Sequence, residues 1–271
     1  MTNAHAAVIL SLKAALRYLA GSPAMLYSYK STSRDRREPG REMKNETEQK
    51  LSVVFGRVFH RQAAQVREQL GREYPDRKAV PDIDFDDLSD DEEAELILIL
   101  TDAVRKGVKL FGQRVGLEPD YTVVNTRAAE WARRYVGQLV KGISETTREA
   151  LRQAIATFAE TPGFTIGDIM KQLPFTAERA LMVAVTETTR AYAQGNRLGA
   201  KQLQEQWPGV KVIRTWFTNN DDLVCPVCGQ LNGAEVGADD PFKLADGTEV
   251  DDPPAHPNCR CWTDFRTRIN G

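Results

Sequence analysis

Residues 206–217 read Q-W-P-G-V-K-V-I-R-T-W-F, and they mark the point where the chain changes from helix to strand. A long helix is predicted over Ala177–Gln206, and the Pro-Gly pair that follows ends it. Val210–Phe217 then alternates β-branched and aromatic residues, which predicts a strand. The sequence therefore predicts an α+β protein, with a mainly α-helical body and a small β-rich C-terminal module (residues 210–271).

Upstream of this boundary, apolar residues recur at helical spacing. They predict one long amphipathic helix over residues 43–74. Further helices are predicted over residues 95–111, 126–160 and 166–173. A basic, polar stretch at residues 31–41 contains Pro39 and Gly40 and predicts an exposed loop.

Composition indicates a globular protein without a membrane segment. The chain has 271 residues, of which 41% are hydrophobic and 27% charged, and no apolar run reaches the roughly 18–20 residues of a membrane span. Residues 6–20 are apolar, but Lys13 and Arg17 interrupt them, so they predict an amphipathic helix rather than a signal peptide. We therefore expect folding in the cytoplasm, where thiols stay reduced.

Charge is segregated along the chain and divides it into three regions. Residues 1–80, a basic helical region, hold 15 Lys and Arg against 8 Asp and Glu. Residues 81–209 form a helical body whose entry segment, residues 81–95, has 9 acids and no base. Residues 96–215 return to an excess of bases, 17 against 11, whereas residues 216–271 hold 4 bases and 10 acids. Basic regions can contact phosphate, although solvated helix faces explain the same pattern.

The acidic entry segment permits two interpretations. In the first, it is a calcium loop whose positions 1, 3, 5 and 12 are Asp82, Asp84, Asp86 and Glu93. Such a loop needs Gly at position 6, where this chain has Asp87. In the second, Ser89 and Glu92 form a capping box at the start of the next helix. We favour the capping box.

All four cysteines lie in the C-terminal module. Cys225 and Cys228 form C-P-V-C, and Cys259 and Cys261 lie in H-P-N-C-R-C, which begins at His256. Two ligands at i and i+3 on a tight turn can reach one ion, so the pattern predicts a structural Zn²⁺. Five candidates compete for four tetrahedral positions. A bound metal would also supply folding free energy to a module with a small core.

Other interpretations of this cluster remain open. Two disulfides, or four reduced thiols, would use the same cysteines. A metal-dependent nuclease is the alternative function, but a catalytic metal needs an open position and a general base. The nearby acids, which more simply form turns, are Asp221, Asp222, Asp251 and Asp252. We therefore expect a protein that is not an enzyme.

Three segments together resemble the phage Mu F-like minor head protein (head morphogenesis) family. They are residues 184–193 (A-V-T-E-T-T-R-A-Y-A), residues 216–233 (W-F-T-N-N-D-D-L-V-C-P-V-C-G-Q-L-N-G) and residues 253–261 (P-P-A-H-P-N-C-R-C). Their order and spacing match the family across residues 143–263. Residues 1–140 carry no motif that we can assign.

The resemblance implies a structural, portal-associated protein of a tailed-bacteriophage head, which acts in head assembly and in genome packaging or delivery. Its implied partners are the portal and other head proteins, with non-specific contact to packaged DNA, and its implied place is the capsid interior near the portal. The implied family residues are Glu187, Arg190, Asp221, Cys225, Cys228, His256, Cys259 and Cys261. Glu187 and Arg190 are i, i+3 neighbours that we expect to pair and to pin their helix to the module.

Overall fold

The computed structural model describes residues 38–73, 85, 88–118, 120–161, 165–219 and 224–269. The predicted helix at residues 6–20, most of the predicted loop at residues 31–41, and Asp221 and Asp222 lie outside these residues. Four acids of the hypothetical calcium loop, Asp82, Asp84, Asp86 and Asp87, lie outside them as well.

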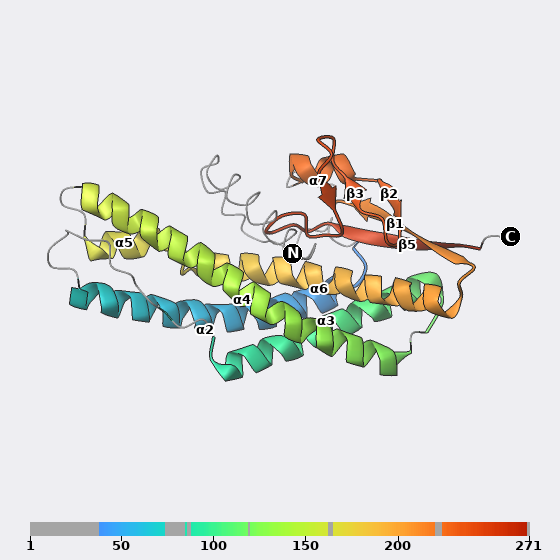
Figure 1. The fold of residues 1–271 in the computed structure, drawn as a ribbon, viewed down its shortest axis with the longest axis horizontal. Helices are drawn as coiled ribbons and strands as arrows, with labels where there is room; N and C mark the ends of the chain where they lie inside the picture. Colours follow the sequence, from blue (N-terminus) through green and yellow to red (C-terminus); the bar gives the residue numbers. More distant parts are fainter. Residues whose placement is uncertain are drawn as a thin grey trace.

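Long helices dominate the fold, and the predicted α+β class is confirmed (Figure 1). The helices are α2 (Arg41–Glu73), α3 (Asp90–Val115), α4 (Tyr121–Glu160), the short α5 (Ile166–Gln172) and α6 (Ala177–Gln206). All of the expected helices among the described residues are present, and α6 has the predicted bounds.

Caps explain where α3 and α4 begin. The Ser89 side chain accepts from the Glu92 backbone, and the Glu92 carboxylate accepts from the Ser89 N–H at 2.9 Å, which confirms the capping box. Helix α4 begins five residues before its predicted start because Asp120 accepts from the Thr122 N–H at 2.9 Å. Helix α3 continues past its predicted end to Gly116, which adopts the left-handed conformation with φ 72°.

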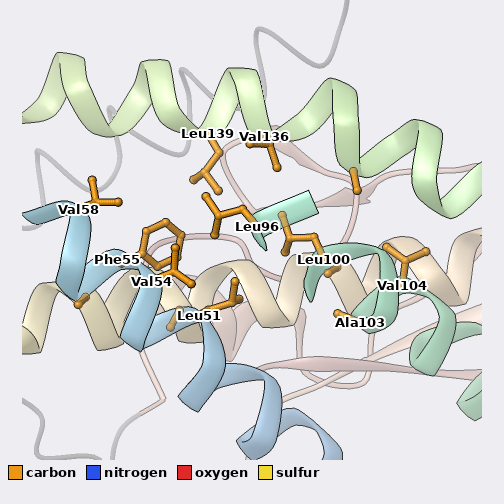
Figure 2. Packing of buried hydrophobic residues seen from close by; sticks show 14 of the residues in the cluster. Leu51, Val54, Phe55, Val58, Leu96, Leu100, Ala103, Val104, Val136 and Leu139 are labelled. Atoms are coloured by element: carbon orange, nitrogen blue, oxygen red, sulfur yellow. The ribbon is translucent and has the colours of Figure 1, made fainter. Parts of the chain in front are cut away.

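The main core lies between α2, α3, α4 and α6. Figure 2 shows Phe55 of α2, Leu96 and Leu100 of α3, and Leu139 of α4 pointing toward one another. Burial of such side chains is the main favourable term in folding, at about 25 cal/mol per Å² of apolar surface. A second core joins the far ends of α2 and α4 to α5, and Phe85 belongs to it.

Two glycines allow α3 and α6 to cross closely. A Cβ on Gly195 would lie 2.1 Å from the Val104 carbonyl oxygen, and one on Gly107 would lie 2.5 Å from the Tyr192 carbonyl oxygen. No side chain fits in this space, so the backbones themselves form the contact between the two helices.

The C-terminal module contains β1 (Val210–Phe217), α7 (Pro226–Leu231), β2 (Glu235–Gly237), β3 (Phe242–Lys243), β4 (Glu249–Val250) and β5 (Trp262–Ile269). One antiparallel sheet has the order β2-β1-β5, and β3 pairs with β4. The predicted strand has the bounds of β1. Gly233 follows Asn232 and Gly247 follows Asp246, and the two glycines adopt φ values of 81° and 82°, as tight Asn-Gly and Asp-Gly turns require.

The module packs directly against the helices. Phe111 of α3 and Phe265 of β5 meet edge to face, with ring centroids 5.2 Å apart. Ala200 and Leu203 of α6 and Val212 of β1 belong to the same core. Arg114 on α3 also donates from Nε to Asp264 at 2.7 Å. A shared core therefore joins the body to the module.

Across the described residues, no helix has both the length and the apolar character that crossing a bilayer requires.

Candidate metal centre

Helix α7 positions the first two cysteines. Cys225 is its N-cap residue, and its Sγ accepts from the Cys228 N–H at 3.3 Å. Pro226 occupies the first turn, where its missing N–H costs nothing because that N–H would have no partner within the helix. The i, i+3 spacing therefore brings both thiols to one side of the turn, with Cys228 almost fully buried.

A second tight turn positions His256 and Cys259. The Cys259 N–H donates to the His256 carbonyl oxygen at 3.2 Å. Asn258 adopts φ 59°, a left-handed conformation that asparagine tolerates better than most residues. Cys261 lies immediately before β5 and is buried, as Cys259 is.

The five predicted ligands come together in space. They form two triads that share Cys228: Cys225, Cys228 and His256, and Cys228, Cys259 and Cys261. Within each triad the ligand atoms lie within 4.8 Å of one another. His256 Nε2 lies 2.9 Å from Cys225 Sγ and 3.2 Å from Cys228 Sγ, and the Cys228 and Cys259 sulfurs are 3.6 Å apart.

These distances suit a small tetrahedral ion. With Zn–S bonds of about 2.3 Å and Zn–N bonds of about 2.0–2.1 Å, neighbouring ligand atoms lie about 3.5–3.8 Å apart. The separation of the Cys228 and Cys259 sulfurs falls within that range. The His256 contacts are a few tenths of an ångström shorter, so an ion would move the imidazole slightly outward. The donor set and its spacing therefore fit a metal ion.

The His256 ring is oriented for ligation through Nε2. Its Nδ1 lies 2.7 Å from the Pro257 carbonyl oxygen, which can only accept, so Nδ1 carries the hydrogen and donates it. The lone pair of a neutral ring is then on Nε2, which faces the two thiols of α7. A hydrogen bond of this kind from the second ring nitrogen is the usual arrangement around a metal-bound histidine.

The surroundings favour thiolates at Cys225 and Cys259, whereas the pKa values of Cys228 and Cys261 are raised, because these two thiols donate hydrogen bonds to the other two sulfurs. A hydrogen bond from Cys228 and the nearby His256 lower the pKa of Cys225 to about 4. Burial opposes ionisation of Cys259, but hydrogen bonds from Cys228 and Cys261 and the charge of His256 hold its pKa well below the usual value. Burial likewise lowers the pKa of His256, but its interactions with Cys225 and Cys259 outweigh burial and raise this pKa to about 9. Thiolates are the form in which cysteine binds metals.

An apolar and aromatic shell surrounds the cluster. Trp216 of β1 and Phe242 of β3 are fully buried and meet edge to face at 5.2 Å. Behind them, buried Arg214 donates to Asp252 at 2.6 Å and to the Asp251 carbonyl oxygen at 2.7 Å. Asp252 is therefore held in an ion pair, and Asp251 is exposed.

Helix α6 contacts the second turn through side chains that the sequence did not single out for this role. Thr186 Oγ1 accepts from the Asn258 N–H at 2.8 Å, and Thr189 Oγ1 donates to the Cys259 carbonyl oxygen at 3.2 Å. The expected pair is present, with Arg190 Nε 3.3 Å from the Glu187 carboxylate. Tyr135 of α4 donates to the same carboxylate at 2.6 Å, a partner with no signal in the sequence.

The model of the family described as Phage Mu protein F like protein matches residues 141–263. Over these residues the chain is similar to the Phage Mu F-like family. The matched segment begins within α4, includes α5 and α6, and contains every candidate metal ligand. No curated protein and no solved structure matches the chain.

Similarity to the Phage Mu F-like family over these residues indicates a phage head morphogenesis protein. The predicted resemblance is confirmed over nearly the expected residues. Such a protein is a component of the virion and works beside other head proteins.

Proposed function

We propose that this protein is a portal-associated minor head protein of a tailed bacteriophage, which acts in head assembly and in genome packaging or delivery. The match of residues 141–263 to the Phage Mu F-like family carries this proposal. A place in the capsid interior near the portal follows from that role. The protein would reach this place from the host cytoplasm, where heads assemble.

We further propose that the Cys/His cluster holds one structural Zn²⁺. Its ligands are Cys225, Cys228, Cys259 and either His256 or Cys261. The two triads and their spacing support this assignment. Four protein ligands leave no open coordination position for a substrate, and the nearby Asp252 is held by Arg214. Zinc in this site would stabilise the module and hold its two turns together.

Co-expression of the full-length protein with the portal protein of the same phage tests the portal association. We expect the two proteins to co-purify in reducing buffer and to co-migrate on size-exclusion chromatography. The major capsid protein of the same phage serves as the control partner. Binding to the major capsid protein without any binding to the portal would contradict the proposal.

A further inference from the structure

One face of α6 supports the second turn of the metal centre. Thr186 and Thr189 are 6% and 5% exposed, and each makes one hydrogen bond to the backbone of that turn. Because water is largely excluded from these hydrogen bonds, losing one partner would leave a buried polar group without compensation. The helical body therefore helps to hold Cys259 in place, in addition to the loop that contains this cysteine.

Arg190 extends from the same helix and is held from two directions. Its Nε donates to Glu187, and its guanidinium lies 5.7 Å from the centroid of the Tyr135 ring. Tyr135 in turn stacks on Trp131 at 4.8 Å and donates to Glu187. Helices α4 and α6 thus fix the guanidinium, and Arg190 lies one helical turn after Thr186, which contacts the second turn of the metal centre.

A zinc–thiolate centre at this site would carry a net negative charge. Zn²⁺ with three thiolates and a neutral histidine carries a net charge of −1, and with four thiolates it carries −2. Cys228, Cys259 and Cys261 are 2%, 1% and 5% exposed, so water offsets little of this charge. Buried charge is costly unless it is paired.

The neighbours of Arg190 stabilise its charged form. Burial alone would lower its pKa, but interactions with Tyr135, Glu187 and Cys259 outweigh burial and raise the pKa. The guanidinium therefore stays positively charged. Glu187 neutralises part of that charge.

We propose that Arg190 is a positioning residue that offsets the negative charge of the zinc–thiolate centre and thereby couples zinc affinity to the packing of α4 against α6. This inference rests on the zinc site proposed above. It assigns the Tyr135–Glu187–Arg190 network a role beyond helix packing. Coupling of this kind is reciprocal, so zinc should also stabilise the α4–α6 contact.

Competition between the zinc-loaded full-length protein and a chromophoric chelator tests the proposal, with Arg190→Gln, Arg190→Lys and the control Lys201→Gln. Lys201 lies on the exposed side of α6, so its loss removes one positive charge away from the cluster. We expect Arg190→Gln to weaken zinc binding by roughly 10–100-fold, as losses of outer-shell partners do. Arg190→Lys should restore most of the affinity, and Lys201→Gln should leave it unchanged.

Two further measurements separate charge compensation from ordinary helix stabilisation. The thiolate-to-metal charge-transfer band of the Co²⁺-substituted protein should shift in Arg190→Gln and not in Lys201→Gln. Thermal unfolding with and without zinc should show that Arg190→Gln reduces the zinc-dependent gain in stability. Equal destabilisation of both forms, with unchanged zinc affinity and an unchanged Co²⁺ spectrum, would overturn the inference. A wild-type protein that binds no zinc would instead refute the metal centre itself.

Discussion

Cys228 is the residue on which the candidate metal centre depends most, because both triads contain it. We expect Cys228→Ser to abolish zinc binding, since a serine hydroxyl is a poor ligand for this ion. Metal analysis of protein purified in reducing buffer should find about one zinc per wild-type chain and almost none in the variant.

The variants His256→Ala and Cys261→Ser test which of these two residues is the fourth zinc ligand. Loss of the true ligand should remove most of the zinc, whereas the other variant should keep near-stoichiometric metal. If both variants keep full occupancy and affinity, the proposed ligand sets are wrong. Disulfide-linked cysteine pairs in freshly lysed cells, with no zinc bound, would contradict the metal assignment as a whole.

At the scale of the element, the crossing of α3 and α6 depends on Gly195. Its substitution by alanine would place a Cβ 2.1 Å from the Val104 carbonyl oxygen and 2.8 Å from the Gly107 Cα, so the helices would have to separate. We expect Gly195→Ala to lower the free energy of unfolding by roughly 1–3 kcal/mol, as overpacking of a core does. Chemical denaturation monitored by circular dichroism measures this change.

Gly137→Ala is the matched control for that experiment. Gly137 lies on the exposed side of α4, and a Cβ there meets nothing within 4 Å. Alanine is the better helix former, so this variant should gain about 0.5–1 kcal/mol. If both alanine variants change the free energy of unfolding by the same amount and in the same direction, the close crossing of α3 and α6 does not depend on a glycine at position 195.

The whole molecule is expected to bind DNA weakly and without sequence preference. Many described bases are already paired with acids, for example Arg57 with Glu95 and Arg127 with Glu205. Contact with phosphate releases counterions, so affinity should fall by about 10³-fold between 50 and 200 mM salt if about six phosphates are neutralised. Fluorescence anisotropy with two unrelated duplexes measures both properties.

Charge-reversal variants test which part of the protein contacts DNA. Arg133 and Arg134 are exposed on α4, so Arg133→Glu with Arg134→Glu should weaken DNA binding and reduce its dependence on salt. Lys243→Glu in the acidic C-terminal module is the control and should change little. A strong preference for one duplex, or a loss of binding only in the control, would contradict non-specific contact through the helical body.

Local patterns in the sequence were sufficient to predict the helices, the strand and the ligand candidates. Pro208 and Gly209 end α6 because of their own backbone chemistry, and i, i+3 spacing brings two ligands to one side of a turn without help from distant residues. The same is true of the capping box at Ser89. The early start of α4 was missed because the Asp120 cap lies outside the apolar periodicity.

The tertiary structure decided what those local pieces contact. Cys228 and Cys259 are 31 residues apart, and only folding brings their sulfurs to 3.6 Å. The support of Cys259 by Thr189, the hydrogen bond of Tyr135 to Glu187, and the core shared by the body and the module likewise join distant segments. Local spacing determines which side chains share a turn, but packing between separate elements determines which turns meet. That packing depends on the shape and burial of the whole chain, which no short sequence pattern contains.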